Sequence, residues 1–397
     1  MTIWLIEPRD PVIFRDGRPF NASPGARAKT MSFPLPATIA GAARTCAGQG
    51  ANGRFDADRI DELLDKRIRG PLLVELREDG SVKDWLFPAP ADALLLKHDP
   101  YNRKQARIVP LTVVDAPPGA TSNLPEGLAL VGSTELANAK PHPRAPAFWH
   151  WDRYLAWLSE PAVQDVELDC FGHAGPVRES RMHVSIRGDT QTAEDGALFK
   201  TSGLEFVHTP KEADVSHPLL AEAQMLGLVV ETNASLREGL DFLGGERRVV
   251  RWRSGPDRLP ECSAQLRQAI MTSRHCRLIL ATPALFARGY LPDKAKLSRS
   301  GVTVIVQAVV NHRYQVVSGW DYVSSRPKPA RRLVPAGSVY FVKLEGDDNA
   351  IGQFVNDVWL QAISDDEQDC RNGFGLALLG TWGGIPKPLI YHAEDAS

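Results

Sequence analysis

The sequence lacks any long apolar run. Across its 397 residues no stretch of about 18 apolar residues occurs, the length that a membrane-spanning helix needs. Residues 1–10 also lack the basic start and apolar core of a secretory signal peptide. We therefore expect a cytoplasmic protein that has no membrane partner.

Cysteine is scarce, and no two cysteines are spaced as a Cys-x-x-Cys pair. This usage excludes a disulfide framework and offers no recognisable zinc-ligand cluster, so we expect free thiols in a reducing compartment and no metal site. The five cysteines are Cys46, Cys170, Cys262, Cys276 and Cys370.

An excess of one charge is also missing, because 46 Lys and Arg residues face 48 Asp and Glu residues, for a net charge of -2. A protein that coats nucleic acid through bulk electrostatics has a strongly basic balance instead. Any nucleic-acid site in this chain must therefore be a local basic patch.

The residue patterns of catalytic sites are absent as well. Gly346-Asp347-Asp348 resembles the tripeptide of polymerase palms, but the neighbouring predicted strand, residues 276–281, supplies no acid for a two-metal site. We interpret Asp347 and Asp348 as part of a strand-to-helix connection. His183 has no acid or nucleophile placed to work with it, which favours a contact role over general-base catalysis. We expect no enzymatic activity and no cofactor.

Basic and aromatic residues are interleaved near the N-terminus, where Arg15 and Arg18 lie between Phe14 and Phe20. Guanidinium groups among aromatic rings suit phosphate contacts and base stacking. The same spacing also fits a surface hairpin held by Arg–Asp pairs, and both interpretations remain open.

Two further stretches carry basic residues. Residues 178–186 alternate as a strand does, which puts Arg181 and His183 on one face and Met182, Val184 and Ile186 on the other. Arg247 and Arg248 follow a Gly-Gly pair, after a helix predicted over residues 236–242. A third basic segment, residues 325–332, contains two prolines, and we expect no regular structure there.

Glycine is concentrated near the end of the chain, where five of the twelve residues 373–384 are glycine. Glycine has no side chain to keep a ligand away, so a loop of this kind can bring its N–H groups to a phosphate. The alternative is a tight connection that packs against a neighbouring strand. The candidate phosphate-binding positions are Gly373, Gly375 and Gly380.

In the last third of the chain the pattern allows strands and a helix to be assigned in order, and they indicate an α+β protein. A sheet with a late helix and a closing strand resembles the ferredoxin-like plan, which is also the scaffold of the RNA recognition motif. The best boundary lies at residues 254–260, and residues 88–146 form a proline-rich insertion with short ordered pieces. The predicted strands span residues 276–281, 302–309, 314–319, 338–344 and 388–391, and the helix spans residues 350–363.

Several stretches, taken in order, resemble one family. It is the third subunit of the Cmr (type III-B) CRISPR effector complex, a member of the RAMP superfamily. The resemblance runs from about residue 3 to about residue 385. The stretches are Ile6-Glu7-Pro8, residues 14–20 (Phe-Arg-Asp-Gly-Arg-Pro-Phe), residues 36–41 (Pro-Ala-Thr-Ile-Ala-Gly), residues 179–184 (Glu-Ser-Arg-Met-His-Val), residues 243–248 (Leu-Gly-Gly-Glu-Arg-Arg), residues 334–341 (Val-Pro-Ala-Gly-Ser-Val-Tyr-Phe) and the glycine-rich residues 373–384.

The resemblance implies two tandem ferredoxin-like domains, residues 1–255 and 256–397, with a loop-rich insertion at about residues 88–157 in the first. It implies a non-catalytic subunit that holds the 5′ handle of the CRISPR guide RNA in antiviral defence. The implied partners are the large polymerase-like subunit, the first Cmr backbone subunit and, indirectly, target RNA. The positions carried over as RNA-binding are Arg15, Arg18, Arg181, His183, Arg247, Arg248, Gly373, Gly375 and Gly380.

Two alternatives remain beside this interpretation. Some RAMP relatives are endoribonucleases that process guide RNA, but the early region where they carry a histidine has none before His98 here. A scaffold subunit without RNA contact is the other alternative, and the basic stretches count against it.

Overall fold

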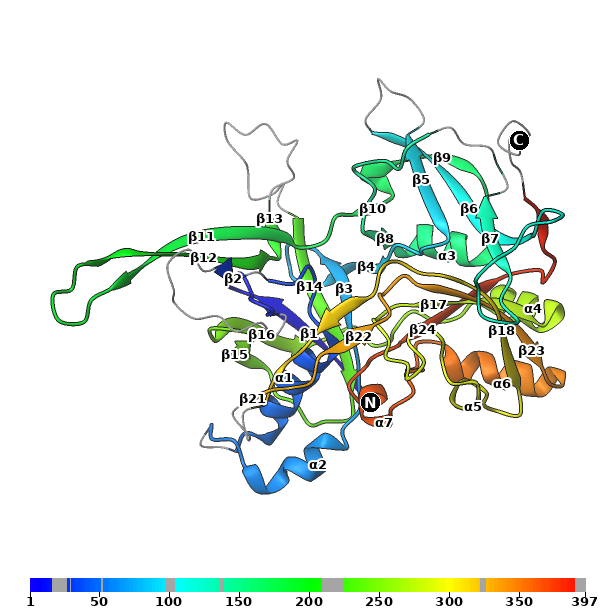
Figure 1. Cartoon of the computed structure of the whole chain (residues 1–397). Helices are drawn as coiled ribbons and strands as arrows, with labels where there is room; N and C mark the ends of the chain where they lie inside the picture. Colours follow the sequence, from blue (N-terminus) through cyan, green and yellow to red (C-terminus); the bar gives the residue numbers. More distant parts are fainter. Residues whose placement is uncertain are drawn as a thin grey trace. The chain divides into compact units, whose positions relative to one another are not determined.

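The structure is a computed structural model. It describes residues 1–15, 27–28, 30–50, 53–97, 104–133, 135, 139–208, 224–321 and 326–389, so Arg18 lies outside the described residues. The described chain consists mostly of strands with a few helices, as Figure 1 shows, which confirms the predicted α+β class. No helix in the described ranges is long and apolar enough to cross a membrane.

The chain divides into two compact units that take alternating segments of the sequence. The first unit comprises Met1–Asp84, Pro176–Arg258 and Gln315–Leu333, and the second comprises Trp85–Gly175, Leu259–Tyr314 and Val334–Ser397. Compact units and sequence domains need not coincide, so the division at residues 255 and 256 stays a prediction.

The core of the first unit is an antiparallel sheet in the order β3-β14-β1-β16-β15. Its central strands bury Ile6, Leu228 and Val250, which have no exposed surface. The strands are β1 (Thr2–Pro8), β3 (Ile68–Leu76), β14 (Gln224–Thr232), β15 (Gly239–Leu243) and β16 (Arg248–Ser254).

The first unit also contains one well-packed helix and several short elements. Helix α1 (Pro36–Gly48) buries Ile39, Ala40 and Ala43, and its small side chains permit close packing. The predicted helix over residues 236–242 is wrong, because residues 239–243 pair with β16 as the edge strand β15. The remaining short elements of this region are the 3₁₀ turn Ala57–Arg59, α2 (Ile60–Leu64) and β13 (Val207–His208).

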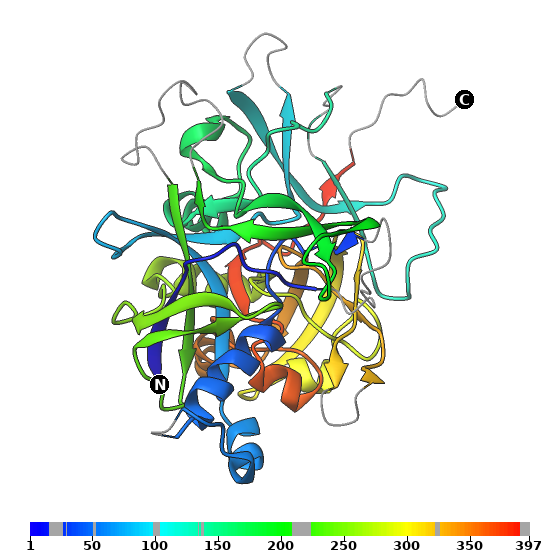
Figure 2. The same cartoon turned by 90° about the vertical axis from the view of Figure 1, so that its left-hand side faces the viewer.

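A long hairpin extends from the first unit. Strand β11 (Val177–Ile186) pairs with β12 (Ala193–Glu205), and β2 (Arg27–Ala28) adds to β12 in parallel. Figure 1 shows the hairpin projecting beyond the sheet of its own unit, and in Figure 2 its turn faces the viewer. Leu204 of β12 bridges to Val12, which fixes the base of the hairpin beside the segment that follows β1.

The basic segment near residue 330 has more regular structure than expected. Strand β19 (Gln315–Val317) pairs with β22 (Arg331–Leu333), and β20 (Trp320–Asp321) pairs with β21 (Arg326–Pro327). The expectation of no regular structure over residues 325–332 is therefore wrong for β21 and β22.

The second unit contains a four-stranded antiparallel sheet in the order β18-β23-β17-β24, of which β17, β18 and β23 lie close to predicted strands. Helix α6 (Asp348–Val358) buries Ile351, Phe354 and Val355. The strands are β17 (His275–Leu280), β18 (Thr303–Val310), β23 (Val339–Glu345) and β24 (Ala377–Thr381), and the other helices are α4 (Ala264–Ser273), α5 (Lys294–Leu297) and α7 (Glu367–Arg371).

The predicted insertion holds more regular structure than its prolines suggested. A second sheet is organised around β6 (Gln105–Asp115), and α3 (Trp151–Ser159) buries Tyr154 and Trp157. The other strands within the insertion are β5 (Ala93–Lys97), β7 (Leu130–Ser133) and β8 (Phe148–His150). The remaining elements outside it are β4 (Val82–Pro88), β9 (Gln164–Glu167), the 3₁₀ turn Leu168–Cys170, β10 (Gly172–His173) and β25 (Lys387–Pro388).

Candidate nucleic-acid interface

The turn between β15 and β16 is held against the segment that follows β1. Gly245 donates its N–H to the carbonyl of Ile13 at 2.7 Å. Gly244 has a φ of +73°, and a Cβ built there would lie 2.4 Å from the Ile13 oxygen. Gly244 is therefore required for a close backbone approach. That approach brings Arg15 next to the turn.

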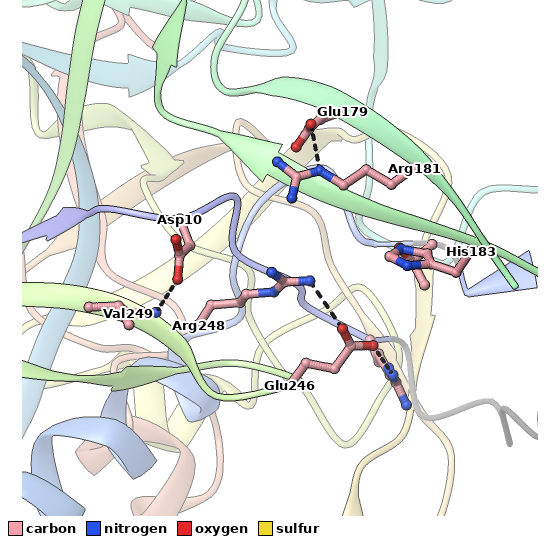
Figure 3. Close-up of polar contacts among 9 residues, drawn as sticks. Asp10, Glu179, Arg181, His183, Glu246, Arg248 and Val249 are labelled. Atoms are coloured by element: carbon pink, nitrogen blue, oxygen red, sulfur yellow. Dashed lines mark hydrogen bonds and ion pairs between the residues drawn. The ribbon is translucent and has the colours of Figure 1, made fainter. Parts of the chain in front are cut away.

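Glu246 joins two of the candidate arginines. Its Oε1 accepts a hydrogen bond from Arg15 Nη2 at 3.0 Å, and its Oε2 accepts one from Arg248 Nη2 at 3.1 Å. Figure 3 shows Glu246 and Arg248 facing each other across the turn. Glu246 has a φ of +60° and Arg247 a φ of +51°, so both residues adopt the left-handed conformation that closes the turn.

Arg247 has a different neighbour. Its guanidinium carbon lies 4.3 Å above the ring centroid of Phe242, an exposed residue of β15. This distance is within the range of a cation–π contact. Arg247 and Arg248 therefore share a turn but engage different groups.

Arg181 and His183 lie on β11 as predicted. Arg181 Nε donates to Glu179 Oε1 at 2.7 Å, and this hydrogen bond, with the Glu179 charge, raises the pKa of Arg181 above its ordinary value. His183 Nε2 lies 2.8 Å from Thr201 Oγ1, and its ring stacks on Phe199 at 5.3 Å between centroids. The histidine is thus oriented by two contacts from β12.

These residues form one cluster within the first unit. Asp10 accepts a hydrogen bond from the Val249 N–H at 3.0 Å, and its charge also contributes to the raised pKa of Arg181. In Figure 3 the side chains of β11 and those of the β15–β16 turn lie around one region. We call this cluster the basic face; it consists of Arg15, Arg181, His183 and Arg248.

The sequence analysis missed the two acids of the basic face. Glu179 and Glu246 pair with three of its arginines, and neither was a candidate residue. The signal was present in the Glu246-Arg247-Arg248 run. Because these arginines already have carboxylate partners, a phosphate must either displace a carboxylate or share the guanidinium with it.

The candidate glycines lie in the second unit, where the N–H groups of Gly373, Gly375 and the neighbouring Leu376 have partners. The N–H of Gly373 donates to Cys370 O, that of Gly375 to Pro283 O, and that of Leu376 to Thr282 Oγ1. The expected loop over residues 373–384 is wrong for Ala377–Thr381, which is strand β24. RNA binding by Gly373, Gly375 and Gly380 stays a prediction.

Packing accounts for two of these glycines. Gly375 has a φ of +81°, and a Cβ there would lie 2.9 Å from Ser364 Oγ. Gly380 lies opposite Arg277 in the sheet, and a Cβ there would lie 2.8 Å from Arg277 Nη2. Each glycine leaves room for a buried polar group.

Asp347 and Asp348 form the connection from β23 to α6, as predicted. Asp347 Oδ1 accepts a hydrogen bond from the Ala350 N–H at 2.8 Å, which caps the helix. Asp348 pairs with Arg274 at 2.6 Å. Both carboxylates therefore have roles at the helix N-terminus.

Solved structures with similar chains come from CRISPR effector complexes. A chain in a type III-B Cmr-beta complex bound to cognate target RNA has 15% identity and a TM-score of 0.45, over 85% of this chain and 86% of that chain. A chain of the same complex bound to target RNA and AMPPnP has 14% identity and a TM-score of 0.44, with the same coverage. A chain of the Csm3-Csm4 subcomplex of a type III-A complex has 9% identity and a TM-score of 0.30, over 87% of this chain and 94% of that chain.

The TM-scores lie below 0.5, so the family assignment rests on sequence. No curated protein matches the chain. The sequence model of the family described as CRISPR-associated protein (Cas_Cmr3) matches residues 4–382, nearly the whole chain. The chain therefore belongs to the Cas_Cmr3 family of CRISPR-associated proteins.

Proposed function

We propose that this chain is the non-catalytic subunit that holds the 5′ handle of the guide RNA in a type III-B CRISPR effector complex. In this proposal it bridges the large polymerase-like subunit to the first backbone subunit and is indirectly associated with target RNA. The complex acts in antiviral defence.

The observation that carries this proposal is the basic face. Three arginines and a histidine are brought together from three segments far apart in sequence, and Glu246 fixes Arg15 beside Arg248. Arg guanidinium groups bind phosphate oxygens bidentately, and the exchange of a carboxylate for a phosphate keeps each arginine paired. Such contacts hold an RNA backbone without reading its sequence.

The strand orders support tandem ferredoxin-like cores. If the four strands of each core are numbered along the chain, the order across the sheet is 2-3-1-4 in both units. In the first unit these strands are β3-β14-β1-β16, and in the second they are β18-β23-β17-β24. Helix α1 follows the first strand of the first core, and α6 follows the third strand of the second. We propose that each sheet is an elaborated ferredoxin-like domain.

The rival function is a guide-processing endoribonuclease. His183 is the histidine of the basic face, and its contacts with Thr201 and Phe199 orient the ring. An active-site base needs a partner that tunes or relays its proton, whereas an orienting hydroxyl and a stacked ring suit a contact role. We therefore propose no catalytic duty for this chain.

The test is guide retention in the assembled complex. The variant Arg15→Gln/Arg181→Gln/Arg248→Gln should lose guide RNA and flatten the log–log salt slope by about two units, at about 0.7 per phosphate contact. The matched control, Arg288→Gln/Lys294→Gln/Lys296→Gln, removes the same charge from exposed positions of the second unit. Equal retention by both variants would contradict the proposal.

The rival function predicts that the same complex cleaves repeat RNA. Under our proposal, incubation of the complex with repeat RNA should leave the RNA intact. Cleavage that is lost in His183→Ala but kept in the control variant would establish the endoribonuclease instead.

A further inference from the structure

Two exposed apolar side chains lie on the edge strand β15, on the sheet face opposite helix α1. Leu240 and Phe242 are two residues apart, so they share one face of the strand, and they are 71% and 45% exposed. The alternate residues face α1, since Leu243 is buried and the Asp241 carboxylate interacts with the Cys46 thiol of that helix. The aromatic ring of β15 therefore lies outside the core of the first unit.

Arg247 covers part of this surface with a planar cation. Its guanidinium carbon lies 4.3 Å from the centroid of the Phe242 ring. Among the described residues Arg247 forms no ion pair, whereas each arginine of the basic face pairs with a carboxylate. Glu246, its neighbour in the sequence, is engaged with two of those other arginines. The partner of Arg247 is therefore the ring and not an acid.

The backbone that carries Arg247 is strained. Glu246 and Arg247 have φ values of +60° and +51°, so two consecutive residues with side chains adopt the left-handed conformation. This conformation costs free energy for any residue but glycine, and asparagine or glycine usually closes such a turn. Strain of this kind is typical of residues that contact ligands. The chain therefore places an arginine where the backbone disfavours one, and from there its side chain reaches Phe242.

The Phe242–Arg247 pair offers stacked planar groups to a ligand that is itself planar. Aromatic rings and guanidinium planes are the groups on which proteins stack unpaired nucleobases, and the RNA recognition motif does so on the exposed face of its sheet. A protein partner fits less well, because a stable interface buries about 800 Å² on each side. Two apolar side chains supply only a small part of that area.

We propose that Leu240, Phe242 and Arg247 form a stacking site for one unpaired nucleobase of single-stranded RNA, whatever its sequence. The proposal rests on the proposed function, since it assumes a chain that holds RNA. The site begins at the turn that also carries Arg248 of the basic face. The basic face then binds phosphates and the stacking site binds a base, so RNA affinity has a salt-dependent part and a salt-independent part.

The test uses the purified full chain and two end-labelled oligomers of equal length, an oligoadenylate and an abasic ribose–phosphate chain. Binding is measured by fluorescence anisotropy from about 50 to about 200 mM salt. Phe242→Leu should weaken oligoadenylate binding by about 5-fold to 150-fold, the usual effect of losing one stacked base. Its log–log salt slope and its affinity for the abasic oligomer should stay unchanged, because no phosphate contact is lost.

Four matched variants separate stacking from charge and from folding. Phe242→Trp keeps an aromatic plane and should keep the affinity. Arg247→Lys keeps the charge but not the plane, so it should weaken oligoadenylate binding at an unchanged salt slope. Arg247→Gly should weaken binding without lowering the thermal midpoint, because glycine suits a φ of +51°. Phe55→Leu, at a ring of the first unit that is 43% exposed, should change nothing.

Five results would overturn the proposal. The first is no binding of oligoadenylate by the unchanged chain at low salt, and the second is full affinity in Phe242→Leu. The third is an equal loss of abasic binding, which would indicate altered phosphate contacts. The fourth is an equal loss in Phe55→Leu. The fifth is loss of a protein subunit from the assembled complex of Phe242→Leu at unchanged oligoadenylate affinity, which would assign the site to a protein contact.

The outcome is separable from that of the proposed function. Guide retention by the basic-face variant in the assembled complex decides the proposed function, and base-dependent binding by Phe242→Leu decides the stacking site. Full guide retention in the first, with a base-dependent loss in the second, would contradict the handle proposal and support the stacking site. The reverse pattern would contradict the stacking site alone.

Discussion

Arg277 Nη1 lies 2.6 Å from Asp92 Oδ2 inside the second unit, and both side chains are only 1% exposed. The pair is well hydrogen-bonded. Asp92 Oδ1 accepts from Trp157 Nε1 at 3.0 Å, and Arg277 donates to the carbonyls of Trp157 and Thr381. The ion pair therefore connects β17, α3 and β24.

Removing one partner should destabilise the second unit strongly. Asp92→Asn keeps the size of the side chain but leaves the Arg277 charge buried without a counterion. We expect a loss of about 3–5 kcal/mol in the free energy of unfolding, the usual cost of breaking a buried pair. Urea unfolding followed by tryptophan fluorescence measures this loss.

The double variant Asp92→Asn/Arg277→Met is the control, because it removes both charges together. It should recover part of the stability, since apolar replacement of a whole buried pair is often tolerated. An Asp92→Asn chain with an unchanged urea midpoint would show that the pair is not structural.

Gly375→Ala should lower stability by about 1–3 kcal/mol, the usual range for a residue held in an unfavourable backbone conformation. Gly375 has a φ of +81°, and the added methyl would meet Ser364. Gly383→Ala is the matched control in the same segment, since a Cβ there has no neighbour within 4 Å. Thermal unfolding distinguishes the two variants. Equal midpoints would mean that the glycine-rich segment tolerates side chains throughout.

Glu246→Gln should tighten RNA binding several-fold. The substitution preserves the shape of the side chain and removes the negative charge that pairs with Arg15 and Arg248. Both arginines then meet phosphate without losing a carboxylate, so the gain should be larger at low salt. Glu62→Gln, an exposed acid on α2, is the control. Weaker binding by Glu246→Gln would indicate that the bridge itself positions the arginines.

Three thiols should make the fold sensitive to alkaline pH. Burial raises the pKa of Cys276 to about 12 and the pKa values of Cys262 and Cys370 to about 11, from an ordinary value of 9.0. Above pH 9.0 the folded chain therefore retains protons that the unfolded chain releases. This contribution to stability is complete below pH 9.0 and is lost as the pH rises toward 11 and 12.

The measurement is the urea midpoint of unfolding as a function of pH, from neutral pH to above pH 9.0. The unchanged chain is compared with the variant Cys262→Ala/Cys276→Ala/Cys370→Ala. The substituted chain is less stable at neutral pH, but its midpoint should fall less steeply with pH. Parallel curves would attribute the alkaline loss to other groups.

The second core was the most predictable part of the fold. Strands β17, β18 and β23 and helix α6 are apolar segments with clear periods. The sequence predicts each of them to within two residues, except that α6 ends at Val358 rather than at residue 363. Strand β15 was predicted as a helix because Leu236 to Phe242 are spaced like one. Its pairing with β16 depends on the tertiary structure, which local propensity does not report.

The candidate site was predictable in its residue types but not in its contacts. Alternation along β11 correctly placed Arg181 and His183 on one strand face. The pairing of Arg15 with Glu246 spans 231 positions in the sequence, and that of Arg277 with Asp92 spans 185. No local pattern indicates such contacts, so glycines that make room for them resemble a ligand loop in the sequence.

The buried pair also constrains how this family can vary. Asp92 belongs to the predicted insertion at residues 88–157, whereas Arg277 belongs to the core strand β17. A homologue that shortens the insertion and loses the aspartate must replace the arginine in the same lineage, or supply another acid at that place. With the arginine gone, the position opposite it, Gly380, is also free to acquire a side chain. Covariation among these three positions is therefore an evolutionary signature of the insertion.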